Sequence, residues 1–339
     1  MLGRRPTMTS RHGMVAAAHP LAAQAGARLL GQGGNAFDAA AATAAALNVV
    51  EPFMSGLAGM GFATMWVGAE QRVRVLDFVP PIPASFPTDR FSQRTDLARG
   101  ALSVASPGNL AGWCELVKTY GRKPLADVLA PAIALARDGF ALAEFGAAEF
   151  EENDPLLKAH AELYPALSAN YQPGGRTLKL GSLLIQPDLA RSLSDIAAKG
   201  PDHFYRGALG EAVVKHLQAL GGSLTMADLA AVKTVWREPL AVSYRGLNVH
   251  VPPPHCEGFQ FLLTLRLLEG LDIGALPKDG PEHLDLVYRA IRLAAGERIA
   301  HNNPSAEQLA EILSDAAVER LRRRLTDGRP VTGPTEQWT

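Results

Sequence analysis

The residues best placed to do chemistry in this sequence are His255, Cys256 and Glu257, which directly follow the prolines Pro252–Pro254. An imidazole, a thiol and a carboxylate are all metal-ligand types, but side chains at successive positions diverge and do not easily converge on one ion. We therefore expect no metal site here. Because a proline run rigidly presents the residues after it, His255 and Glu257 are predicted to line a substrate pocket. The alternative interpretation is an ordinary turn between a strand and a helix.

A nucleophile of a familiar type is missing from the sequence. The chain has no G-x-S-x-G motif, and neither Cys114 nor Cys256 lies in a recognisable cysteine-protease signature. Two cysteines are also too few for a disulfide scaffold or a thiolate metal site. An enzyme with this sequence therefore depends on a cofactor or takes its nucleophile from elsewhere.

A glycine-rich stretch, Gly31–Ala36, matches the pattern G-x-G-x-x-A of dinucleotide-binding sites. That pattern binds a pyrophosphate only where a strand precedes it and a helix follows. Here the preceding segment is predicted to be a helix that ends at Gly31. We therefore expect no nucleotide site.

The charge balance gives no reason to expect nucleic acid or a membrane surface as a partner. The 339 residues include 33 basic and 34 acidic side chains, for a net charge of −1. One basic run, formed by Arg320, Arg322, Arg323 and Arg324, is predicted to be a solvated helix face. No apolar stretch is long enough to span a membrane. The N-terminus lacks the apolar segment of a secretory signal, which predicts a cytoplasmic location.

Hydrophobic periodicity and capping residues predict alternating strands and helices, which indicates one α/β domain over residues 1–339. Pro20 opens a helix that ends at Gly31, and Asn35 caps a nearly all-alanine helix with Asp38 in its first turn. Side chains this small predict deep burial. The polar residues 153–176 are predicted to form a loop. Strands are predicted at 14–18, 62–67, 72–78, 240–244 and 247–251, and helices at 108–139 in two pieces broken near Pro124, 187–199, 206–220, 258–270, 281–300 and 306–325.

The order of these segments resembles the gamma-glutamyltranspeptidase family along nearly the whole chain. Five collinear blocks carry the resemblance, and together they are far more specific than any single motif. The blocks are HGMVAAAHPLAAQAGARLLGQGGNAFDAAAA (12–42), VASPGNLAGWCELVKTYGRKPLADVLAPAIALARDGF (104–140), QPDLARSLSDIAAKGPDHFYRG (186–207), GGSLTMADLAAVKTVWREPLAVSYRG (221–246) and VPPPHCEG (251–258).

The resemblance implies a four-layer αββα N-terminal-nucleophile hydrolase, made as a proenzyme that cuts itself into two chains. A threonine at the new N-terminus of the smaller chain would attack an amide carbonyl, with its own α-amino group as the base. An oxyanion hole would stabilise the tetrahedral intermediate. No metal or organic cofactor is implied. The expected partners are the smaller chain, in a heterodimer or a dimer of heterodimers, and a small-molecule amide.

The end of the sequence at Thr339 is expected to lie at or beside the cut. A nucleophile of this class needs a free amine, and Thr339 is joined to Trp338. We therefore expect no catalytic residue on this chain, with the nucleophilic threonine just after Thr339. The other interpretation is that Thr339 is itself the nucleophile. The preceding Gly333–Trp338 fits a flexible leader to the cut.

Two departures from the family pattern bear on the substrate. In glutamyl-specific relatives, Leu-Asp-Phe is followed by an arginine that binds the α-carboxylate of the substrate, whereas Leu76–Phe78 is followed here by Val79 and Pro80. The family's Pro-Pro-Pro-Ser-Ser-Gly also becomes Pro-Pro-Pro-His-Cys-Glu-Gly. Both changes argue against glutathione and favour an acyl group without an α-amino-acid head, as in glutaryl-type cephalosporin acylases. The predicted substrate-binding positions are Phe78, Val79, Pro80, His255 and Glu257. The missing charge could instead come from Arg72, Arg74 or Arg90.

These observations predict the large chain of a gamma-glutamyltranspeptidase-like amidohydrolase or acyltransferase with atypical acyl specificity. One alternative is a catalytically inactive scaffold or binding protein derived from the same proenzyme fold. Self-cleavage separates the two, because it uses the same threonine hydroxyl as turnover. A second alternative is a conventional amidase whose whole active site lies on this chain, and the missing nucleophile signature argues against it.

Overall fold

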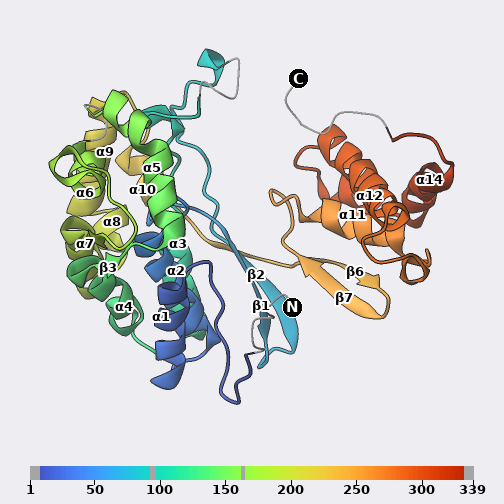
Figure 1. Ribbon diagram of the computed structural model, residues 1–339, viewed down its shortest axis with the longest axis horizontal. Coiled ribbons are helices and arrows are strands. Elements are labelled where there is room, and N and C mark those ends of the chain that lie inside the picture. The colour runs from blue at the N-terminus through green and yellow to red at the C-terminus, as the bar shows by residue number, and fades with distance from the viewer. Residues whose placement is uncertain (1–7, 92–96, 162–164, 332–339) are drawn as a thin grey trace. The chain divides into compact units, whose positions relative to one another are not determined.

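A computed structural model describes residues 8–91, 97–161 and 165–331, and the chain within it divides into two compact units (Figure 1). The first unit contains the residues up to Gly61 together with Phe78–Thr234. The second unit contains Phe62–Asp77 together with the residues from Val235 onward. Each unit has its own hydrophobic core. That residues 1–339 form a single domain stays a prediction.

The first unit is built almost entirely of helices around the alanine-rich α2. Its elements are α1 (Pro20–Gly31), α2 (Ala36–Val50), α3 (Asn109–Tyr120), α4 (Leu125–Asp138), β3 (Phe140–Ala141), α5 (Glu144–Ala159), α6 (Pro165–Tyr171), β4 (Leu183–Leu184), α7 (Pro187–Lys199), α8 (Asp202–Tyr205), α9 (Ala208–Ala219) and α10 (Met226–Ala231). The helices α1, α3 and α4 all contact α2. Close approach of α1 requires Gly26, where a Cβ would lie 2.2 Å from Oγ1 of Thr43 on α2.

The N-terminus of α2 is fixed by a buried carboxylate. Asn35 accepts hydrogen bonds from the backbone N–H of Phe37 and Asp38, and Asp38 accepts one from Asn35 at 2.8 Å, which completes a capping box. The Asp38 carboxylate is 0% exposed and also accepts backbone N–H groups of Arg122 and Lys123 at 3.1 and 3.2 Å. One side chain therefore connects α2 to the turn between α3 and α4.

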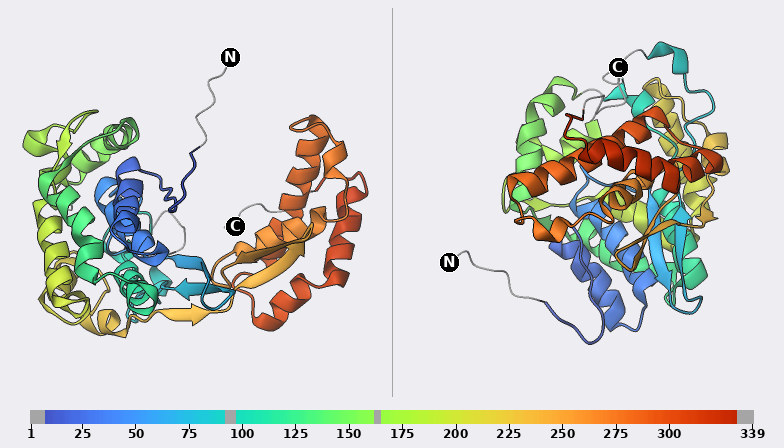
Figure 2. Two further views of the ribbon diagram at one scale, coloured as in Figure 1. Left: turned by 90° about the horizontal axis from the view of Figure 1, so that it is seen from below. Right: turned by 90° about the vertical axis from the view of Figure 1, so that its right-hand side faces the viewer.

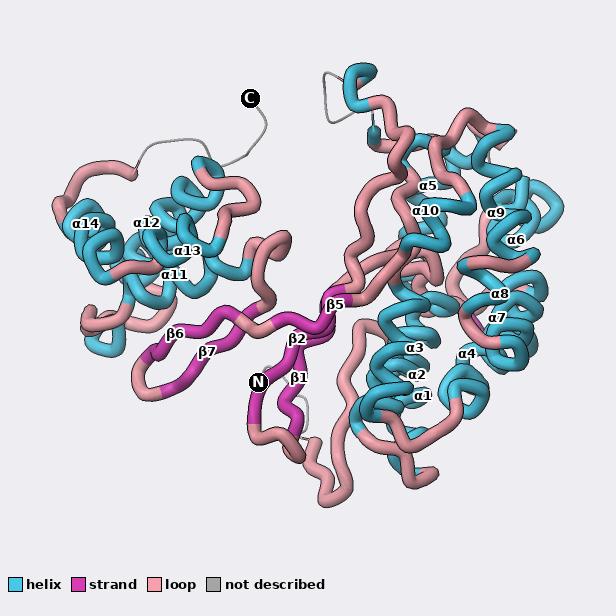
Figure 3. The backbone as a smooth tube through the Cα atoms, turned by 180° about the vertical axis from the view of Figure 1, so that it is seen from behind, coloured by secondary structure: helices cyan, strands magenta, loops and turns pink. Residues whose placement is uncertain are grey.

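The second unit combines strands and helices. Its elements are β1 (Phe62–Val67), β2 (Arg72–Asp77), β5 (Val235–Arg237), β6 (Leu240–Tyr244), β7 (Leu247–Val251), α11 (Gly258–Leu268), α12 (Pro281–Ala300), α13 (Ala306–Ile312) and α14 (Asp315–Thr326). The strands β1, β2 and β5 form an antiparallel sheet in that order, and β6 and β7 form a hairpin (Figure 3). The helices α12 and α14 pack beside α11 (Figure 2).

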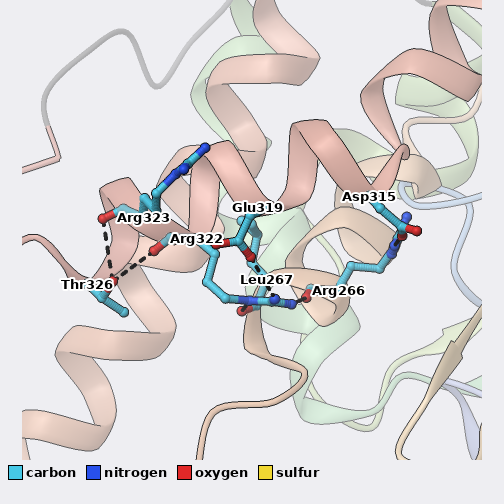
Figure 4. A network of polar contacts seen from close by, with 7 residues as sticks. All are labelled: Arg266, Leu267, Asp315, Glu319, Arg322, Arg323 and Thr326. Atoms are coloured by element: carbon cyan, nitrogen blue, oxygen red, sulfur yellow. Dashed lines mark hydrogen bonds and ion pairs between the residues drawn. The ribbon is translucent and has the colours of Figure 1, made fainter.

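The basic run on α14 does more than face solvent. Arg322 donates to the backbone oxygens of Arg266 and Leu267 at 2.7 and 3.3 Å (Figure 4). Both of these acceptors lie in the last turn of α11. A cation at that end of a helix also complements its dipole. Arg323 and Arg324 are exposed, so the prediction of a solvated face is wrong only for Arg322.

Three local predictions differ from the structure. The segment Met14–Ala18 forms no strand, and Met14, Ala16 and Ala18 are exposed. Val15 packs on α1, where its Cγ1 lies 3.0 Å from the Cβ position of Gly26. The predicted loop at 153–176 is helical as far as Ala159 and again from Pro165. The predicted helix 306–325 is two helices, because Ser314 caps the second by accepting from Ala317 N–H at 3.2 Å.

Replacing Asp38 with asparagine is expected to destabilise the protein by about 2–4 kcal/mol. An amide offers one oxygen where the carboxylate offers two, and its NH₂ group would face backbone donors in a buried site. Urea unfolding of the purified protein measures the change. The matched control is Asp127→Asn on the exposed first turn of α4, for which we expect less than about 0.5 kcal/mol. Equal unfolding midpoints for both variants would contradict the role given to Asp38.

Candidate functional site

The predicted site residue Phe78 lies in a slot lined by glycines in the first unit. Its backbone N–H donates to the oxygen of Gly61 at 3.0 Å. A Cβ at Gly112 would lie 2.5 Å from the Phe78 ring, and one at Gly108 would lie 1.9 Å from the Phe78 carbonyl oxygen. Phe78 is buried, and its ring packs in this slot and so fixes the position of the chain just before Val79.

Of the two neighbours of Phe78 in the predicted site, Pro80 is buried and Val79 is half-buried. Val79 is therefore the most accessible of the three positions. The glycine-spaced loop before β1 is held on α3 nearby, because the Asn109 amide donates to the Gly56 oxygen at 2.7 Å. The backbone N–H groups of Gly108 and Asn109 both donate to the Gly59 oxygen, at 2.7 and 2.8 Å.

The other two predicted residues, His255 and Glu257, lie in the second unit and have different partners. Nε2 of His255 lies 3.2 Å from Oδ2 of Asp77, and Glu257 forms an ion pair with Arg298 of α12 at 2.6 Å. The two side chains therefore diverge, as expected for positions beside Cys256. Within the described ranges, no group of three or more His, Cys, Asp or Glu could hold a metal ion.

Asp77 is the centre of an arrangement that the sequence did not reveal. It is 3% exposed, and its Oδ2 accepts from Nε of Arg237 at 2.6 Å in addition to its contact with His255. Arg237 and Asp77 are 160 residues apart and meet because β5 pairs with β2. The sequence signal was a single acid in a strand of otherwise apolar and basic residues, which gives no partner by itself.

The arginines proposed as alternative sources of charge are placed as follows. Arg72 pairs with Glu70 at 2.8 Å and with Glu238 at 3.2 Å. Arg74 pairs with Glu70 at 2.9 Å and lies 5.0 Å from the ring centroid of Trp236. Arg90 is exposed in a short 3₁₀ helix, Thr88–Arg90, of the first unit. Arg72 and Arg74 are therefore already committed to acids of their own sheet region.

The first unit also contains an open cavity of about 1030 Å³ beside α5. Its lining combines the acids Glu144 and Glu151 with the bases Arg176 and Lys179, and it includes none of the predicted site residues.

The thiol of Cys114 on α3 is unsuited to nucleophilic attack. Burial raises its pKa to about 12, so the reactive thiolate is scarce at neutral pH. Cys256 is half-buried and lies between two side chains that are directed to Asp77 and Arg298. Among the residues that the structure describes, neither cysteine has a basic partner of the kind that activates a catalytic thiol.

A sequence model of gamma-glutamyltranspeptidase matches residues 22–337, and the chain belongs to the gamma-glutamyltranspeptidase family. It is 39% identical over 339 residues to the acylase ACY 1 proenzyme of Pseudomonas sp. (strain SE83), covering 96% of this chain and 60% of that protein. The chain therefore spans less than two thirds of that relative.

Two solved structures place the fold. The structure is similar to Helicobacter pylori gamma-glutamyltranspeptidase with a TM-score of 0.89 and 27% identity, covering 97% of this chain and 96% of that one. It is similar to the cephalosporin acylase of Bacillus halodurans with a TM-score of 0.86 and 31% identity, covering 95% of this chain and 61% of that one. The fold is thus that of the N-terminal-nucleophile hydrolases, which confirms the predicted fold class. In the part of the chain that is described, no helix has the length and apolar character of a membrane span.

The Gly112→Ala substitution is expected to destabilise the protein by about 1–3 kcal/mol, because the new methyl group would overlap the Phe78 ring. Thermal or urea unfolding measures the change, and combining it with Phe78→Leu should recover part of the loss. Gly296→Ala is the control, since Gly296 lies within α12 with nothing near its Cβ position and should gain up to about 1 kcal/mol. A stabilising Gly112→Ala would show that Phe78 is not held by this slot.

Proposed function

We propose that this chain is the larger fragment of a self-cleaving precursor and acts with a smaller chain as an N-terminal threonine amidohydrolase. The observation that carries the proposal is collinear similarity to an acylase proenzyme over 96% of this chain, which spans only 60% of that relative. The buried Cys114 and the absence of a nucleophile motif support a nucleophile outside the described residues. Thr339 and Gly333–Trp338 lie outside the described residues.

The proposed reaction has two steps. The threonine hydroxyl of the smaller chain attacks the amide carbonyl while its own α-amine takes the hydroxyl proton, and the amine leaves with a proton. Water then hydrolyses the ester to release the acid, or an acceptor amine takes the acyl group. The positions proposed to contact substrate are Val79 in the first unit, with Phe78 and Pro80 packed beside it, and His255 and Glu257 in the second unit, each taken by itself.

The acyl group that fits best is one without an α-amino-acid head, such as glutaryl. Val79 occupies the position at which the resemblance implies an arginine that binds the α-carboxylate of an amino-acid head, and an apolar side chain cannot make that charge-assisted contact. A glutaryl group keeps a carboxylate at the same end of its chain but lacks the α-ammonium, so its carboxylate must be bound by another residue. Similarity to proteins named acylase agrees with this class of substrate. The same valine is the observation that favours the second candidate, an inactive scaffold of the same fold.

Intact mass and N-terminal sequencing of the purified full-length gene product test the proposal. We expect two fragments, the smaller of which begins with threonine, because cutting and turnover use the same hydroxyl. Replacing that threonine with alanine should leave one uncut chain. A native product that stays whole would reject the amidohydrolase and favour the scaffold.

Substrate class is tested by comparing glutaryl and γ-glutamyl p-nitroanilides with the cut protein. The two acyl groups share the terminal carboxylate and differ in the α-ammonium of the γ-glutamyl group. We expect kcat/KM to be at least about tenfold higher for the glutaryl compound, because an ammonium that is buried without a partner costs binding free energy. Acetyl p-nitroanilide serves as the short, uncharged control. A preference for the γ-glutamyl compound would mean that another group binds the α-amino-acid head.

A further inference from the structure

Three polar side chains meet on the β1–β2–β5 sheet of the second unit. Oδ2 of Asp77 lies 2.6 Å from Nε of Arg237 and 3.2 Å from Nε2 of His255. Asp77 is 3% exposed, whereas the side chains of Arg237 and His255 are 36% and 44% exposed. A buried carboxylate therefore holds two nitrogen-bearing groups that reach the surface.

The strand register places this group on one face of the sheet. Phe62 is opposite Asp77, and Val75 is opposite Arg237. Directly opposite residues in an antiparallel sheet project to the same side. The same side therefore carries Phe62 and, by the two-residue alternation, Trp66 and Val235.

Apolar side chains share this face with the charged group. Val235, directly opposite Asp77, is 44% exposed, and Trp66, which lies four residues further along β1 than Phe62, is 58% exposed. The rings of Phe62 and His255 have centroids 6.2 Å apart. A ligand on this face would meet apolar groups beside a guanidinium, which suits a short aliphatic chain that ends in a negative charge.

The remaining charges near this sheet are directed elsewhere. Arg72 and Arg74 alternate onto the opposite face, where they pair with Glu70. Glu238 pairs with Arg72, and Glu257 pairs with Arg298. Among the residues of β1, β2 and β5, the charged side chains on this face are Asp77 and Arg237, and the imidazole of His255 lies beside them.

A guanidinium has five N–H donors in a planar fork, and the bond to Asp77 uses the one at Nε. Fixing Nε orients the fork, so less freedom is lost when a second carboxylate binds. We propose that Arg237, positioned by Asp77 and flanked by His255, binds the free carboxylate of a dicarboxylic acyl group. Phe62 and Val235 contact the methylene chain of that group. This inference rests on the proposed function and names its substrate as a dicarboxylic acid monoamide.

Calorimetric titration of the full-length gene product with glutarate tests the site, with neutral glutaramide as the ligand control. We expect glutarate to bind at least about tenfold more tightly than glutaramide. Arg237→Gln should weaken glutarate binding by about tenfold to hundredfold and leave glutaramide unchanged, because one charge-assisted contact is lost. The matched control is Arg72→Gln, which removes a guanidinium from the opposite face of the same sheet and should leave both ligands unchanged.

Removing Arg237 alone leaves Asp77 buried without that cation, so Arg237→Gln could fail to fold. The double variant Asp77→Asn with Arg237→Gln replaces both charges by neutral groups and should fold while losing the preference for glutarate. Asp77→Asn alone should weaken the binding of glutarate several-fold and leave the binding of glutaramide unchanged. A purely structural residue would affect the binding of both ligands.

Equal glutarate affinity in the native protein and in the double variant would overturn the proposal. So would a native protein that binds glutarate no more tightly than glutaramide. Separation of the two chains by Arg237→Gln, with glutarate binding intact, would assign the guanidinium to a carboxylate of the partner chain and also overturn it. Cleavage is scored separately by mass, so an uncut protein that loses glutarate binding on substitution rejects only the proposed reaction.

Discussion

The buried carboxylate of Asp38 is the constraint on which the first unit depends. An alanine-rich helix has little side-chain surface with which to fix its own position, and along residues 39–46 of α2 only Thr43 departs from alanine. Asp38 fixes that position, because its oxygens must face the backbone N–H groups of Asn35, Arg122 and Lys123. Once the helix is oriented, its small side chains allow the close approach that Gly26 completes on α1.

Asp77 is also buried, but its surroundings give it a different consequence. The groups that donate to Asp38 are backbone N–H groups, so this carboxylate fixes the positions of backbone segments. Asp77 is met by the side chains of Arg237 and His255, both of which extend to the surface. A buried acid that faces backbone donors fixes helices, whereas one that faces side-chain donors fixes groups that can still meet a ligand.

The parts of the fold that were predictable from sequence are those with local causes. The bounds of α1, α7 and α12 follow from prolines and periodic apolar residues, and α2 follows from its cap at Asn35. The hairpin of β1 and β2 follows from two-residue alternation around a turn. The buried strand predicted at Met14–Ala18 was wrong on both counts, because Met14, Ala16 and Ala18 are exposed and the segment forms no strand.

The candidate site was less predictable because its contacts are distant in sequence. His255 was identified from the proline run before it, yet its partner Asp77 and the cation Arg237 could be found only when β5 was known to pair with β2. No residue near Arg237 marks it as different from the other arginines of the same sheet. The register does so, because it separates the face of Arg237 from the face on which Arg72 and Arg74 are paired with Glu70.

This difference bears on how acyl specificity can change within one fold. In the family pattern that the sequence resembles, an arginine directly follows the Leu-Asp-Phe segment, and in this chain Val79 stands there, just after the end of β2 at Asp77. Arg237 is fixed through a tertiary ion pair with Asp77, so its loss would affect both stability and recognition. On the proposed role, the carboxylate of the substrate is bound by Arg237, whose ion pair with Asp77 also stabilises the sheet, and not by a residue at position 79. A carboxylate at the far end of the acyl chain is common to glutaryl and γ-glutamyl groups, so Arg237 would serve both, and the α-ammonium is the group that would separate the two substrates.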